Sequence, residues 1–148
     1  MHHRGEDNKF SPETVTADKG DVLEFHFGPK NHSVAMGEFD SVNGPCVPAN
    51  EGGFFSGYFA VDSGESDKVF RVQINDTEPI VFYSTQDNEC SEGMIGAVNL
   101  ASNDDLNEYR EKASSLSRAV APPPPTAASS VKVGLVGVFA VALAALMV

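Results

Sequence analysis

At 148 residues the chain has room for one domain of ordinary size together with flanking tails. The formal net charge is -11, with 21 acidic residues against 10 basic ones, so the chain lacks the clustered Lys and Arg that nucleic acid or an anionic membrane surface would attract. Only two cysteines occur, and neither belongs to a CxxC pair typical of zinc or thioredoxin chemistry. Two distant cysteines suggest one disulfide, which requires an oxidising compartment.

The first element in chain order is a predicted N-terminal tail over residues 1–8. It lacks the apolar stretch and small-residue cleavage site of a secretory signal peptide. Either the gene model starts late, or the anchoring signal predicted below for the C-terminus is wrong. Because the other features of the chain indicate secretion, we expect a missing first exon to supply the signal peptide.

Short runs of β-branched and aromatic residues between turn residues predict an all-β domain over residues 9–112. Predicted strands cover residues 14–17, 21–27, 69–74, 80–83 and 95–98. The strongest alternation lies in 21–27, where Leu23, Phe25 and Phe27 share one face and His26 points outward. These patterns favour a β-sandwich over a helical fold.

The segments between and after the strands have different predictions. Residues 37–57 are too rich in Gly, Pro and Asn for a ladder and are predicted to form a long loop. Carboxylates such as Glu65 are predicted to be solvated loop charges. A short helix is predicted over residues 103–118, with Asn103 or Asp104 as its cap.

The C-terminal part has the composition of an anchoring signal. Residues 113–132 begin with small residues and continue into a Ser, Pro and Ala-rich spacer, and residues 133–148 are wholly apolar or glycine. Small residues, a spacer and a terminal apolar tail are the arrangement of a glycosylphosphatidylinositol (GPI) signal, in which the tail is removed. A tail-anchored membrane helix is the alternative, but about 20 residues are needed for such a span and basic flanks are scarce.

Several segments between residues 9 and 100 resemble the fungal extracellular cupredoxins when they are taken in order. They are Phe10-Ser11-Pro12, Thr14 to Ala17, Gly20-Asp21 with Leu23 to Phe27, Asn31 to Val34, Pro45-Cys46, Phe55-Ser56-Gly57 and Pro79 to Met94. The resemblance implies a cupredoxin-like Greek-key β-sandwich of seven or eight strands. From the residues themselves we expect the short C-terminal helix and a disordered tail to follow it. The resemblance also implies a type 1 copper site at one end.

The copper ligands of that family are only partly present. His32 matches the first imidazole and Met94 the axial thioether, whereas Ser84 stands where the thiolate should be and Glu89 where the second His should be. The resemblance also pairs Cys90 with Cys46 in a disulfide. We therefore expect no cofactor. The alternative is a copper-binding or electron-transfer protein that uses His32 and Met94 with non-standard ligands.

Two sequons provide candidate glycosylation sites, of which Asn75 lies in a predicted turn and Asn31 abuts the metal end. No Ser, His and acid constellation, paired carboxylate motif or phosphate loop is recognisable, so an enzyme is not expected. The sequence predicts a monomeric, extracellular, GPI-anchored surface or binding module with a degenerate copper site. A cell-wall polysaccharide or a surface protein is the kind of partner considered, whereas nucleic acid is not.

Overall fold

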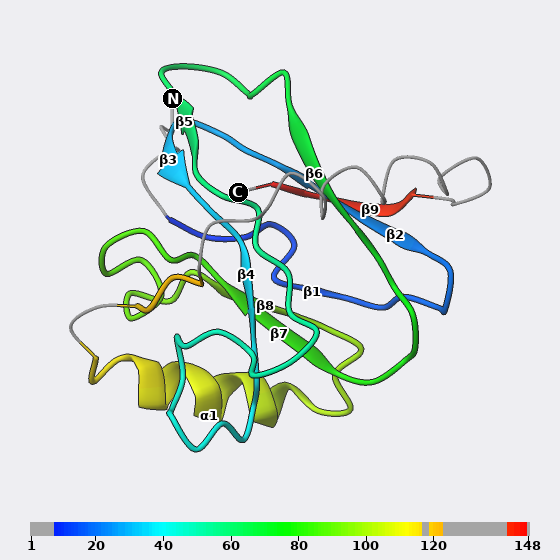
Figure 1. Cartoon of the computed structure of the whole chain (residues 1–148), viewed down its shortest axis with the longest axis vertical. Coiled ribbons are helices and arrows are strands. Elements are labelled where there is room, and N and C mark those ends of the chain that lie inside the picture. Colours follow the sequence, from blue (N-terminus) through cyan, green and yellow to red (C-terminus); the bar gives the residue numbers. More distant parts are fainter. Residues whose placement is uncertain (1–7, 117–118, 123–141, 148) are drawn as a thin grey trace.

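The computed structural model describes residues 8–116, 119–122 and 142–147. Within them lie nine strands and one helix (Figure 1). Their bounds are β1 Thr14–Val15, β2 Val22–His26, β3 Lys30–His32, β4 Ala35–Gly37, β5 Phe59–Val61, β6 Val69–Gln73, β7 Ile80–Tyr83, β8 Ile95–Val98, α1 Asn103–Ala113 and β9 Ala142–Met147. Eight of the strands lie between residues 9 and 112, in agreement with the expected β-sandwich.

The strands form two facing sheets and a small extra ladder. One sheet has the order β1-β8-β7-β4, the other has the order β6-β2-β9, and β3 pairs with β5. Most neighbours are antiparallel, whereas β1 runs parallel to β8 and β9 runs parallel to β2. In Figure 1 the helix α1 lies beneath the sheet that contains β7 and β8.

The main core fills the space between the two sheets. Alternation along β2 buries Leu23 and Phe25, and Phe27 follows on the same face. The ring of Phe25 packs edge to face on Phe82 of the opposite sheet, with centroids 5.2 Å apart. This confirms the inward face that the sequence predicted for residues 21–27.

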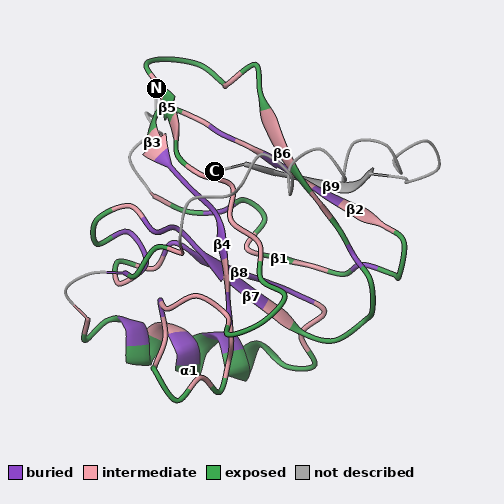
Figure 2. Cartoon of the chain, in the orientation of Figure 1, coloured by how far each residue is buried: buried purple, intermediate pink, exposed green. Residues whose placement is uncertain are grey.

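A second core lies on the other side of β7 and β8. Val81, Tyr83 and Ile95 face this side, where Leu106 and Tyr109 of α1 pack on them. Strands β7 and β8 are therefore buried on both faces, which explains why they read as continuous apolar runs (Figure 2).

The helix α1 is shorter than predicted and starts at a different cap. It ends at Ala113 instead of residue 118, and the side chain of Ser102 accepts a hydrogen bond from the backbone N–H of Asp104. The predicted caps, Asn103 and Asp104, are thus the first residues of the helix, because the Ser102 hydroxyl satisfies the free N–H there.

The remaining differences concern short or terminal elements. Strand β1 ends at Val15 instead of residue 17. Strands β3, β4 and β5 were not predicted, since each has only three residues and little alternation. The predicted long loop is confirmed between β4 and β5.

Residues 1–7, 117–118, 123–141 and 148 lie outside the described residues. Most of the predicted N-terminal tail and most of the predicted C-terminal tail therefore lie outside them as well.

The described part of the chain contains no helix of the length and apolarity needed to cross a bilayer. Residues 142–147 of the predicted anchoring tail are described as strand β9, paired with β2.

Candidate functional site: a polar pole between β3 and the loop after β7

The candidate site, here called the polar pole, consists of His32, Ser33, Ser84, Thr85 and Glu89. His32 ends β3, and Ser84 follows β7 at the start of the loop that returns to β8 at Ile95. All five residues are at least nine-tenths buried. Because buried polar groups need hydrogen-bond partners, the arrangement of these side chains is strongly constrained.

Backbone hydrogen bonds close the loop that carries Glu89. The N–H of Ser84 donates to the carbonyl of Met94 at 3.2 Å, and the N–H of Met94 donates to the carbonyl of Glu89 at 2.8 Å. The N–H of Glu89 donates to the carbonyl of Gln86 at 3.0 Å. These contacts fix Glu89 opposite His32 although the two residues lie far apart in the sequence.

The carboxylate of Glu89 joins the pole together. The Ser84 hydroxyl donates to Glu89 Oε2 at 2.6 Å. His32 Nδ1 lies 3.1 Å from both carboxylate oxygens of Glu89. A protonated Nδ1 would give a charge-assisted contact between two side chains that are largely removed from water. Glu89 therefore links His32, which matches the first imidazole ligand of the cupredoxins, to Ser84, which stands at the position of their thiolate ligand.

This bridge is a Ser, acid and His constellation, which the sequence analysis did not expect to find. Its order differs from that of a catalytic triad, in which the hydroxyl bonds the imidazole and the acid bonds the other ring nitrogen. Here the Ser84 hydroxyl donates to the acid, and Glu89 lies between Ser84 and His32. In this arrangement His32 does not bond the Ser84 hydroxyl, so the three side chains do not have the order of a catalytic triad.

A second set of hydrogen bonds extends the pole toward the surface. The hydroxyls of Ser33 and Thr85 lie 2.7 Å apart, and Thr85 Oγ1 donates to the hydroxyl of Tyr58 at 2.9 Å. Sequence reasoning missed these residues. Only their place in the sequence could have pointed to them, because Ser33 directly follows His32 and Thr85 directly follows Ser84.

The donor set at the pole lacks the sulfur ligand of type 1 copper. Both cysteines of the chain are joined in a disulfide, so no thiolate is available. Met94 is fully buried in the core between the sheets. Among the described residues, no three His, Cys, Asp or Glu side chains come together in a way that could hold a metal ion. A nearly trigonal site of two imidazoles and a thiolate does not fit these residues.

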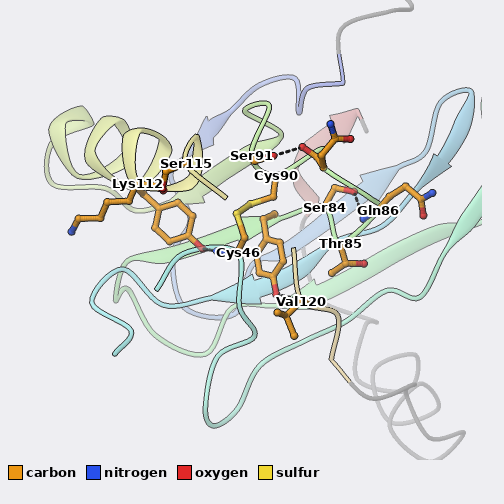
Figure 3. The surroundings of a disulfide bond; sticks show 12 residues. Cys46, Ser84, Thr85, Gln86, Cys90, Ser91, Lys112, Ser115 and Val120 are labelled. Atoms are coloured by element: carbon orange, nitrogen blue, oxygen red, sulfur yellow. Dashed lines mark hydrogen bonds between the residues drawn. A yellow bond between two sulfur atoms is a disulfide. The ribbon is translucent and has the colours of Figure 1, made fainter. Parts of the chain in front are cut away.

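The disulfide joins Cys46 of the long loop to Cys90, which directly follows Glu89 (Figure 3). The two Cα atoms lie 6.1 Å apart, within the usual range. The backbone N–H of Cys46 also donates to the hydroxyl of Tyr109 in α1 at 2.8 Å. The predicted pairing is therefore present, and the helix provides a second attachment for the loop. Burial raises the pKa of Tyr109 to about 12, so its hydroxyl stays protonated.

A separate charged cluster lies on the outer face of β2. His26 Nδ1 contacts Glu65 at 2.7 Å and Nε2 contacts Glu24 at 2.6 Å, while Arg71 Nε donates to the other oxygen of Glu24 at 2.8 Å. The hydrogen bond to Glu65 raises the pKa of His26, and the one from Arg71 lowers the pKa of Glu24. His26 points outward as predicted. Glu65, however, is bonded to His26 and is not simply a solvated charge.

The two sequons lie in different surroundings. Asn75 is exposed after β6. Asn31 is half-buried, its amide nitrogen donates to Gln86 Oε1 at 3.3 Å, and its Oδ1 is buried without a partner. Attachment of a glycan needs a free, accessible amide nitrogen, so the surroundings are more open at Asn75.

The facing sheets, the disulfide and the positions that surround the pole agree with the resemblance to the fungal extracellular cupredoxins. The chain is similar to two proteins of the fungus Arthroderma benhamiae. One is named "Probable GPI-anchored cupredoxin-1" and is 30% identical over 114 residues, which are 76% of this chain and 56% of the relative. The other, an extracellular serine-rich protein, is 33% identical over 108 residues, which are 71% of this chain and 40% of the relative.

The chain thus spans about half the length of the curated relatives it matches. Among solved structures, reduced auracyanin from the photosynthetic bacterium Roseiflexus castenholzii matches with a TM-score of 0.47 and 17% identity, over 66% of this chain and 90% of that one. No family model matches the sequence.

Proposed function

We propose that this protein is a GPI-anchored cell-surface module whose cupredoxin-like domain has exchanged its copper site for a hydrogen-bonded pole and acts without enzymatic chemistry. The names of the two relatives support an extracellular, lipid-anchored location. The order of small residues, spacer and apolar tail over residues 113–148 supports the anchor. Binding at the surface, to a polysaccharide or a protein, is the role proposed for the domain.

The observation that carries the proposal is the bridge made by Glu89. A free metal site keeps its donor atoms available, whereas the Glu89 carboxylate already accepts from Ser84 and contacts His32. A hydroxyl is far too weakly acidic to replace a thiolate at neutral pH. The pole therefore satisfies its own polar groups without a metal ion, as buried polar groups must.

Copper loading tests the pole. The secreted protein, incubated with copper(II) and then desalted, should retain no stoichiometric copper and show no intense absorption near the red end of the visible spectrum. The double variant Ser84→Cys with Glu89→His restores the missing ligand types at the two positions and should bind copper with the blue colour of a copper–thiolate bond. The matched control, Ser91→Cys with Glu92→His, introduces the same side chains in the same loop but away from His32 and should stay colourless.

The same experiment evaluates the alternative, a copper protein that uses His32 and Met94 with unusual ligands. An intensely coloured or stoichiometrically copper-loaded wild type would support that alternative and refute a pole that works without metal. A colourless double variant would show that positions 84 and 89 do not surround a common centre with His32.

Phospholipase release tests the anchor. When the chain is expressed with a signal peptide, a phosphatidylinositol-specific phospholipase should release it from the cell surface, with residues 133–148 missing from its mass. A variant with two charged residues in the tail, Val138→Lys and Val141→Lys, should lose surface attachment because the apolar signal is interrupted. Surface protein that resists the enzyme and keeps residues 133–148 would contradict the anchor.

A further inference from the structure

A groove runs along one edge of the sandwich, on the side away from β9. It lies between residues 48–56 and strand β6, which pairs only with β2 in the described part of the chain. We call it the edge groove. Its volume is about 690 Å³, which is within the range of sites that hold a ligand. Because β6 is an edge strand, part of its backbone N–H and C=O groups face this groove instead of another strand.

The side chains that line the edge groove are apolar or neutral, with one basic exception. Four phenylalanines line it, and each is half-buried: Phe54, Phe55, Phe59 and Phe70. The exposed amides of Gln73 and Asn75 and the guanidinium of Arg71 lie along the same edge. Among the described residues, none that lines the groove is acidic, and Glu51 of the loop 48–56 is exposed and not part of the lining.

The chain itself returns to this groove after the helix. Ala119 is buried, and the backbone of Val120 is held at both ends: its N–H donates to the carbonyl of Cys46 at 2.8 Å, and its carbonyl accepts from the hydroxyl of Tyr83 at 2.7 Å. Two residues later Pro122 lines the edge groove. Pro122 is also the first of four consecutive prolines. The hydrogen bonds of Val120 therefore hold the start of the proline run against the edge groove.

The chemistry of a proline run matches the edge groove. Prolines have no backbone N–H and offer only carbonyl acceptors, while a groove without carboxylates and with amide and guanidinium groups supplies donors. Aromatic faces are the surfaces on which extended proline-rich segments are commonly bound, because the preformed polyproline helix loses little entropy on binding. The covalent link through Val120 also gives the run a high effective concentration at the groove.

We propose that the edge groove is a polyproline-binding site and that its occupant is this chain's own segment Pro122–Pro125. The bound segment straps the start of the spacer to the domain beside β6. This inference does not depend on the lipid anchor or on the state of the polar pole.

Nuclear magnetic resonance of the full chain tests the strap directly. Nuclear Overhauser effects are expected between the ring protons of Pro123–Pro125 and those of Phe54, Phe55 or Phe70. Substitution of Pro123, Pro124 and Pro125 by Ser should abolish them and shift the amide resonances of residues 48–56 and 69–73. The control, Ala127→Ser with Ala128→Ser, leaves the prolines intact and should leave both regions unshifted.

A groove variant provides an independent arm that keeps the prolines. Gln73→Glu is nearly isosteric and places a carboxylate beside the proline carbonyls, so it should release the run and reproduce the shifts of residues 48–56. Asn43→Asp adds the same charge in an exposed loop outside the groove and should not do so.

Two results would overturn the strap. One is the absence of contacts between the prolines and the phenylalanines, with groove resonances that are unchanged by the triple substitution. The other is a groove that responds only to an added ligand, such as a β-glucan oligosaccharide or a free tetraproline peptide, while the chain's own run stays unbound. In that case the groove would be a site for an external partner.

Discussion

Removal of the disulfide between Cys46 and Cys90 is expected to cost a large share of the stability of the domain. The two cysteines are 44 residues apart in the sequence. In the chain-entropy model a closed loop of this length contributes about 4 kcal/mol to the free energy of unfolding. Because natural domains have unfolding free energies of only about 5–15 kcal/mol, the reduced protein should retain little stability.

Urea unfolding monitored by far-ultraviolet circular dichroism measures this effect, and it suits a chain without tryptophan. Oxidised wild type should be compared with wild type kept reduced, because the two differ in the cross-link but not in their buried sulfur atoms. The double variant Cys46→Ala with Cys90→Ala should lose somewhat more, since both positions are fully buried and smaller side chains leave space there. If oxidised and reduced wild type agreed within about 1 kcal/mol, the loop-closure reasoning would be refuted.

Three further outcomes follow from packing and charge. Gly96→Ala should destabilise the domain by about 1–3 kcal/mol in the same assay, because an added Cβ would lie against the ring of Phe82. Tyr83→Phe should cost about 1 kcal/mol through the lost hydrogen bond to the segment after the helix. His26 has a pKa raised above 6.5 by Glu65, so its contribution is complete below pH 6.5 and is lost as the pH rises through the folded-state value. The unfolding free energy of wild type should therefore fall over this window more than that of His26→Gln, and equal pH profiles would contradict this.

The strands predicted best are those with strong local patterns. Residues 22–26 alternate because one face meets the core, and residues 80–83 and 95–98 are continuous apolar runs because both of their faces are covered. Strand β3 could not be predicted in this way. Its residues Lys30 to His32 are polar or charged, Lys30 has a positive φ, and the strand exists because it pairs with β5 across a long connection.

The candidate site was predictable as a set of positions but not as a network. Family order placed His32, Ser84 and Glu89 near one end of the sandwich. Which of them would bond to which depended on the closed loop after β7, and no local pattern encodes that geometry. The contact of His26 with Glu65 could not be predicted for the same reason. The contact of His26 with Glu24 did have a local signal, since residues two apart on a strand share a face.

Because α1 covers β7 and β8, a large partner cannot contact the outer face of these two strands. In the described part of the chain, a ligand that recognises the face of a sheet would meet the outer surface of the sheet β6-β2-β9. That surface carries Glu24, His26 and Arg71 in one bonded group, so contact there would require charges of matching sign and spacing. Salt would weaken such contact strongly, whereas it would scarcely affect binding in an apolar edge groove.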